Sequence, residues 1–119
     1  MIDGLDRMMQ FQQTALALRS QRQELLAGNM ANADTPGYKA VDFDFGAALK
    51  AATEARSARD TPAPAPEVRY RIPAQASLDG NSVEMDNERA QFADNAVRQE
   101  AAMRFLTAQV KTMLAAIGG

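Results

Sequence analysis

The sequence predicts a mainly α fold: long N- and C-terminal helices forming a coiled-coil pair, with a small irregular and β-containing middle region. Apolar residues recur at alternating spacings of three and four near both ends of the 119-residue chain. The five prolines all lie within residues 36–73. Only 22 residues are Leu, Ile, Val or Phe, so we expect one thin domain that completes its core against partners.

The first predicted helix covers residues 5–33, inside an N-terminal segment 1–37 that also holds the following turn. Pro36 ends it because proline cannot continue the hydrogen-bond ladder, and Gly37 permits a tight turn. The expected apolar stripe contains Leu5, Met8, Phe11, Ala15, Leu18, Arg22, Leu25 and Asn29, widened by Met9, Leu16, Leu26, Met30 and Ala33.

Arg22 is a charge on this otherwise apolar stripe, and a lone buried charge is costly. Its side chain either extends to solvent at the edge of the stripe or forms an ion pair with Glu24, Glu100 or a neighbouring subunit. We favour the ion pair because Asn29 and Asn32 continue the stripe with polar groups.

The middle region, residues 38–85, is predicted to be irregular. Alternation of apolar and polar residues indicates short extended segments, and Asp79-Gly80-Asn81 is typical of a turn. The expected elements are an extended segment at 41–45, a short exposed helix at 45–59, a flexible Ala/Pro linker near 60–66, a strand at 68–72 and a small hairpin around 76–85.

Two groups of charged residues in the middle region have both a chemical and an ordinary interpretation. Asp42 and Asp44 share one face of a strand, where they could bind a cation or share a proton. We favour a solvated face opposite buried Phe43 and Phe45. The run 69–71 (Arg-Tyr-Arg) could contact phosphates, but an exposed strand is the simpler interpretation.

The C-terminal segment, residues 86–119, predicts a second long helix over 87–117. Asp86 is the expected N-cap, and Glu88 is favourable in the first turn of a helix. The expected coiled-coil seam contains Met85, Arg89, Phe92, Ala96, Gln99, Met103, Leu106, Val110, Met113 and Ile117.

Composition argues against several classes of function. The chain has no Cys and no His, and its net charge is −2. The commonest nucleophile–base pairs and metal ligands are therefore missing, and no overall charge attracts nucleic acid. No run approaches the length of a membrane-spanning helix, and the acidic N-terminus does not fit a cleaved secretory signal. We expect no enzyme, no cofactor, no metal, no nucleic acid partner and no membrane span.

The most informative stretch is the end of the first helix. Its Asn-x-x-Asn-x-x-Thr-Pro-Gly-Tyr pattern is formed by Asn29, Asn32, Thr35, Pro36, Gly37 and Tyr38. This pattern resembles the N-terminal motif of bacterial flagellar axial proteins. Within that group the chain is similar to proximal rod proteins of the FlgB type, through residues 18–22, 38–45, 79–86 and 105–117. The resemblance covers nearly the whole chain except the Ala/Pro linker.

The resemblance implies a structural subunit of the basal-body rod, exported without a cleaved signal peptide and assembled into a helical tube across the periplasm. Its implied partners are copies of itself, other rod subunits, and an adaptor subunit and export gate at the rod base. A soluble helical hairpin that binds a partner helix, as a chaperone does, is the alternative. The residues expected at subunit interfaces are Leu18, Arg22, Leu25, Asn29, Asn32, Thr35, Pro36, Gly37, Tyr38, Phe92, Met103, Leu106, Val110, Met113 and Ile117.

Overall fold

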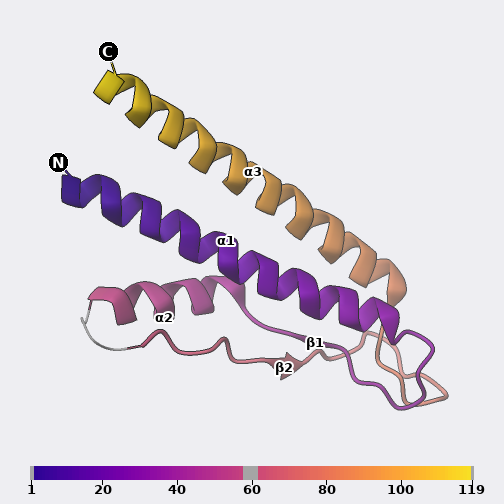
Figure 1. Ribbon diagram of the computed structural model, residues 1–119. Helices are drawn as coiled ribbons and strands as arrows, with labels where there is room; N and C mark the ends of the chain where they lie inside the picture. Colours follow the sequence, from indigo (N-terminus) through magenta and orange to yellow (C-terminus); the bar gives the residue numbers. More distant parts are fainter. Residues whose placement is uncertain (1, 58–61, 119) are drawn as a thin grey trace.

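The computed structural model describes residues 2–57 and 62–118. Within these two ranges the chain forms three helices and two short strands (Figure 1). In chain order they are α1 (Ile2–Ala31), β1 (Val41–Asp42), α2 (Phe45–Ser57), β2 (Arg69–Tyr70) and α3 (Met85–Gly118). The mainly α fold with two long terminal helices and a small irregular middle region is confirmed.

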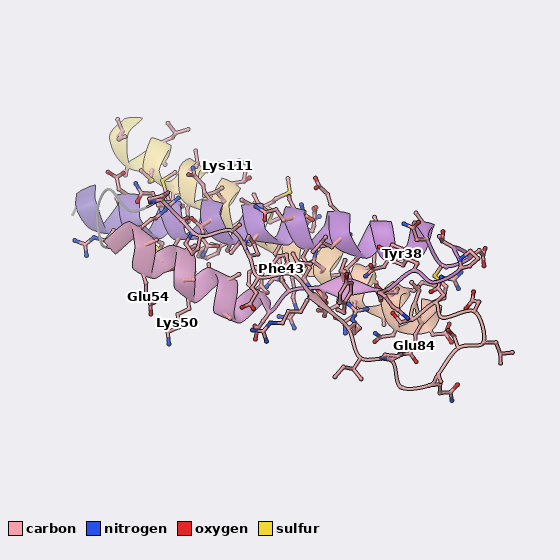
Figure 2. All side chains as sticks on the ribbon, turned by 90° about the horizontal axis from the view of Figure 1, so that it is seen from below. Tyr38, Phe43, Lys50, Glu54, Glu84 and Lys111 are labelled. Carbon is pink, nitrogen blue, oxygen red and sulfur yellow. The ribbon has the colours of Figure 1, made fainter. Side chains whose placement is uncertain are left out.

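Helix α1 is the centre of an elongated molecule measuring 63 × 30 × 18 Å. Helix α3 runs antiparallel along one side of it, so the two termini lie at the same end (Figure 1). Helix α2 and the strands cover the other side of α1. The side chains of Lys50 and Glu54 point away from α1 on α2, whereas Lys111 lies at the opposite side of the molecule (Figure 2).

The core is thin, as the composition predicts. The buried apolar side chains of the described residues are Ala15, Leu18, Leu26, Ala40, Phe43, Ala52 and Ala55. Most of them are alanines, which bury little area each. Of the expected α1 stripe, Leu18 is buried, Leu25 is half-buried, and Leu5, Met8 and Phe11 remain about 40% exposed.

The middle region contains less β structure than predicted. The two strands pair antiparallel through only two residues each, Val41 with Tyr70 and Asp42 with Arg69. The first extended segment stops early because Asp44 caps α2: its Oδ1 accepts a hydrogen bond from the Ala47 N–H at 3.1 Å. The predicted short helix is therefore present as Phe45–Ser57. Residues 58–61, which held its expected end and the start of the linker, lie outside the described residues.

The hairpin predicted around residues 76–85 is wrong. The backbone groups that would pair two strands there bond to the segment after α1 instead. Ser82 N–H donates to the Tyr38 carbonyl at 2.9 Å, and Ser82 Oγ accepts from the Ala40 N–H at 2.8 Å. Residues 79–83 therefore form a turn packed against residues 37–40.

The α3 prediction needs two corrections. The helix begins at Met85, so Asp86 lies within its first turn and is not the N-cap. The predicted set of α3 residues in the seam with α1 is also only partly correct. Phe92, Gln99, Leu106 and Met113 are half-buried as expected. The fully buried residues of α3, however, are the polar Glu88 and Asn95, while Met103, Val110 and Ile117 are exposed.

Candidate subunit-assembly site

Asn29 organises the chain reversal after α1. Its side chain is fully buried and makes four hydrogen bonds. Nδ2 donates to the Val41 carbonyl at 2.8 Å and to Glu88 Oε2 at 3.1 Å. Oδ1 accepts from the Tyr38 hydroxyl at 3.1 Å and the Val41 N–H at 3.0 Å. One amide thus satisfies both backbone groups of Val41 and joins α1 to β1 and α3.

The remaining residues of the motif shape the turn that follows α1. Asn32 Nδ2 donates to the Gly28 carbonyl at 2.8 Å, and its Oδ1 accepts from the Thr35 hydroxyl at 3.1 Å. Gly37 has φ 75°, a conformation that glycine adopts without a steric penalty. Its N–H donates to the Asp79 carbonyl at 2.9 Å. Pro36 is exposed at the tip of the turn.

Asn81 caps the C-terminal end of α1 from a distant part of the chain. Its Nδ2 lies within hydrogen-bond distance of three carbonyls, those of Asn32, Ala33 and Thr35, at 2.9, 3.0 and 2.7 Å. These carbonyls belong to the end of a helix and the turn after it, where internal donors run out. The sequence identified Asn81 only as a turn residue, because nothing in its neighbours reveals a contact made across nearly fifty residues.

Five side chains form what we call the polar junction: Arg22, Asn29, Asp42, Arg71 and Glu88. Arg22 binds both Asp42 oxygens at 3.0 Å, and Arg71 Nη2 binds Asp42 Oδ2 at 2.7 Å. Arg71 Nη1 also pairs with Glu88 Oε1. The junction therefore joins α1, β1, α3 and the segment after β2 through charge-assisted bonds.

The polar junction corrects three interpretations of the sequence. Arg22 does form an ion pair within the chain, but its partner is Asp42, which was not among the candidates. Asp42 is not on a solvated face, since its side chain is 18% exposed between two arginines. Arg71 is likewise directed inward, whereas Asp44, Arg69 and Tyr70 are exposed as expected.

Burial by itself raises the pKa of the Asp42 carboxyl. Hydrogen bonds from Arg22, Arg71 and the Phe43 N–H outweigh that effect, so the pKa lies below its ordinary value. Nearby, Arg19 lies over the Phe45 ring, 3.9 Å from its centroid. Burial is the main cause of a lowered Arg19 pKa, and the positive charges of Arg98 and Arg22 add to it.

The lowered Asp42 pKa predicts a pH dependence of stability. A carboxyl whose pKa is lower in the folded state stabilises the fold fully above its unfolded pKa of about 3.9. That contribution is lost as the pH falls through the folded value. We expect the unfolding free energy of the purified chain to exceed that of Asp42→Asn at pH 6, and the difference to shrink below pH 4. Denaturant titrations across this range measure it. Asp94→Asn, at an exposed carboxylate, is the control, and a difference that does not change with pH contradicts the prediction.

Polar contacts continue along the seam between α1 and α3. Asn95 Nδ2 donates to the Arg19 carbonyl at 2.9 Å and to Gln23 Oε1 at 2.7 Å. Gln99 Nε2 donates to Ser20 Oγ at 2.9 Å. The central part of this helix pair is therefore held by amides as much as by apolar side chains.

At the end that holds both termini, the helix pair is open and apolar. A groove of about 410 Å³ lies between α1 and α3, lined by Leu5, Met8, Met9, Phe105, Ala108, Gln109, Thr112 and Met113. Other large apolar side chains near this end are exposed, namely Phe11, Met103, Val110, Leu114 and Ile117. Clustered apolar exposure of this kind marks a contact surface.

The chain is similar in sequence to known proteins of the bacterial flagellum. Residues 9–39 match the family described as Flagella basal body rod protein. The chain is 47% identical to the flagellar basal body rod protein FlgB of Escherichia coli, over 96% of this chain and 95% of that protein. It is 46% identical to the protein of that name from Salmonella typhimurium, over 100% and 99%. The Cereibacter sphaeroides protein is 45% identical over 88% and 89%.

The chain belongs to the flagellar basal body rod protein family. It is a structural subunit of the flagellar proximal rod and not an enzyme, and it assembles with other flagellar components. Nothing in the comparisons favours the chaperone-like alternative. Within residues 2–57 and 62–118, no helix is long and apolar enough to cross a membrane. Residues 29–38, which contain the Asn-x-x-Asn-x-x-Thr-Pro-Gly-Tyr pattern, lie within the matched residues 9–39.

Proposed function

We propose that copies of this rod subunit assemble into an open helical tube that transmits torque and surrounds the export channel. In this arrangement α1 and α3 form the inner layer, and residues 38–85 form the outer portion. The units 1–37, 38–85 and 86–119 correspond to these inner, outer and inner parts. Open assembly requires different surfaces on the two sides of each contact, which the asymmetric position of α2 and the strands provides.

The observation that carries the proposal is the apolar surface at the end of the helix pair. Val110 and Leu114 are 37% and 64% exposed, although an isolated helix pair gains stability by burying such side chains. Met103 and Phe105 are each 48% exposed beside them. The intramolecular seam does not use this surface fully, so we assign it to contacts between subunits.

The position at the base of the rod is also part of the proposal. We infer that one end of the assembled subunits meets an adaptor subunit and the export gate, and that the chain reaches the periplasm through the flagellar export apparatus without a cleaved signal peptide. The lack of cysteine suits an oxidising compartment. The thin core suits export of an unfolded chain, because little buried area must be lost first.

Val110→Asp tests the proposal. A charge placed in an apolar subunit contact has no partner, so its burial is strongly unfavourable. We expect complete loss of swimming in a strain carrying only this variant, with the chain still synthesised but absent from isolated basal bodies by mass spectrometry. Leu106→Asp, at a half-buried position of the seam, should have the same effect.

Ala101→Asp is the matched control, because it adds the same charge at an exposed position of the same helix. We expect this variant to swim and to be incorporated. Normal motility of Val110→Asp would contradict the assignment of this surface to subunit contacts. Absence of the unmodified chain from intact basal bodies would contradict the rod assignment as a whole.

A further inference from the structure

Helix α3 is rotated away from the orientation that its own apolar pattern favours. Two sets of residues spaced by seven compete for the seam with α1. We call one the anchor column: Glu88, Asn95, Ala102 and Gln109. We call the other the apolar column: Ala96, Met103, Val110 and Ile117. In the structure the anchor column faces α1, and the last three members of the apolar column are exposed.

The two columns are offset from each other by one residue in the sequence. With 3.6 residues per turn, one residue corresponds to a rotation of about 100° around the helix axis. Phe92, Gln99, Leu106 and Met113 lie beside both columns, so they contribute to the seam in either orientation. Hydrophobic burial alone favours the apolar column, because Met103 buries more apolar area than Ala102 and Val110 is apolar where Gln109 is polar.

Buried hydrogen bonds account for the observed orientation. Glu88 is fully buried and pairs with Arg71 and with Asn29 Nδ2 at 3.1 Å. Asn95 is fully buried and bonds to the Arg19 carbonyl and to Gln23. Rotation of α3 would remove both side chains from these partners and leave buried polar groups unsatisfied. Buried polar groups in helix pairs are known to select one register at a cost in stability.

We propose that Glu88 and Asn95 are positioning residues that hold α3 in this rotational orientation, so that Met103, Val110 and Ile117 remain turned away from α1. The use of these three residues in subunit contacts rests on the proposed function. The orientation of α3 does not, and it is measurable in a single chain.

The test uses cross-linking of introduced cysteines, because the chain contains no cysteine of its own. Gln109 Nε2 lies 3.1 Å from Met8 Sδ, a contact between the ends of two long side chains, so a short bifunctional thiol reagent that bridges a Met8→Cys/Gln109→Cys pair reports the observed orientation. The same reagent on Met8→Cys/Val110→Cys reports the rotated one. With the purified full-length chain, we expect the first pair to cross-link at least about tenfold faster, a preference of about 1.4 kcal/mol. Equal rates, or faster cross-linking of the second pair, overturn the proposal.

Each pair is then placed in the Glu88→Ala/Asn95→Ala background, which removes the polar anchors without adding large apolar side chains to the anchor column. We expect the preference to fall to within about twofold, a difference of about 0.4 kcal/mol between the two orientations. Asp94→Ala/Glu100→Ala is the matched control, since it makes two alanine substitutions at exposed positions of the same helix. Glu88→Gln keeps an acceptor oxygen for Arg71 and should keep the preference. A preference retained in the Glu88→Ala/Asn95→Ala chain overturns the proposal.

If circular dichroism shows that this double variant is unfolded, Asn95→Ala alone decides. A reduced preference in that folded chain supports a positioning role, because a residue that only added stability would leave the orientation unchanged. An unchanged preference overturns it. Motility does not enter this experiment. Failure of Val110→Asp to block assembly would therefore contradict the proposed subunit surface, while the cross-linking result would still stand for the orientation.

Discussion

Replacing Glu88 by alanine should lower the unfolding free energy of the purified chain by about 3 kcal/mol, because removal of one partner from a buried ion pair leaves the other charge uncompensated. Glu88 is fully buried, and it accepts hydrogen bonds from both Arg71 and Asn29. Arg71 retains Asp42 as a second partner, which places the expected loss at the lower end of the usual range. Urea titration followed by circular dichroism measures the change.

Two further variants serve as comparisons for Glu88→Ala. Glu88→Gln retains one acceptor oxygen, so we expect it to lose less than half as much stability as Glu88→Ala. Glu100→Ala removes a carboxylate from an exposed pair with Arg104, and exposed pairs contribute about 0.2–1 kcal/mol. If Glu88→Ala were no more destabilising than Glu100→Ala, the polar junction would not hold the two sides of the molecule together.

Asn29→Ala should have the second large effect, about 3 kcal/mol, because it removes four hydrogen bonds and leaves Val41 N–H and C=O without partners in a buried site. Asn32→Ala is the natural control, since it belongs to the same sequence motif. Its side chain is half-buried and bonds to Gly28 and Thr35, both within four residues of it, so we expect about 1 kcal/mol or less. Similar losses for the two variants would contradict the central role of Asn29.

Both variants also have an expected consequence in the cell. The polar junction joins α1 to the strands and α3, so its loss should separate the helix pair from the middle region before it disrupts either helix. We expect strains carrying Glu88→Ala or Asn29→Ala to swim poorly and to incorporate less of the chain into basal bodies. Soft-agar motility and mass spectrometry of isolated basal bodies measure this. Asn32→Ala should behave like the unmodified chain.

Local patterns predicted the helices well and the strands poorly. The spacing of apolar residues and the Thr35-Pro36-Gly37 run indicated both long helices to within three residues of their observed ends. The strands were overestimated because alternation of apolar and polar residues describes an extended chain but not its partner. Residues 79–83 have a composition typical of a hairpin turn, but in the structure they form hydrogen bonds with residues 37–40 and do not close a hairpin.

Some residues of the candidate site could likewise be predicted from the sequence, and others could not. Asn29 and Tyr38 were identified from the motif, and the structure brings them together through one hydrogen bond. Asp42 and Arg71 were interpreted as exposed because each alternates with apolar residues, as on a strand with one solvated face, and Glu88 was interpreted as a helix-end charge because it lies in the first turn of the C-terminal helix. Among the four charged residues of the polar junction, only Arg22 gave a signal in the sequence, as a charge on an apolar stripe.

By itself, the sequence determined the elements of this rod subunit: two terminal helices, a thin alanine-rich core, and a turn shaped by proline and glycine. These features depend on contacts between residues a few positions apart, so local spacing records them. The tertiary structure alone decided that α3 runs antiparallel to α1, that four charges meet at the polar junction, and that Glu88 and Asn95 face α1 while Val110 and Ile117 face away. Such choices depend on hydrogen bonds between residues far apart in the chain, and a buried polar side chain has the same letter in the sequence as an exposed one.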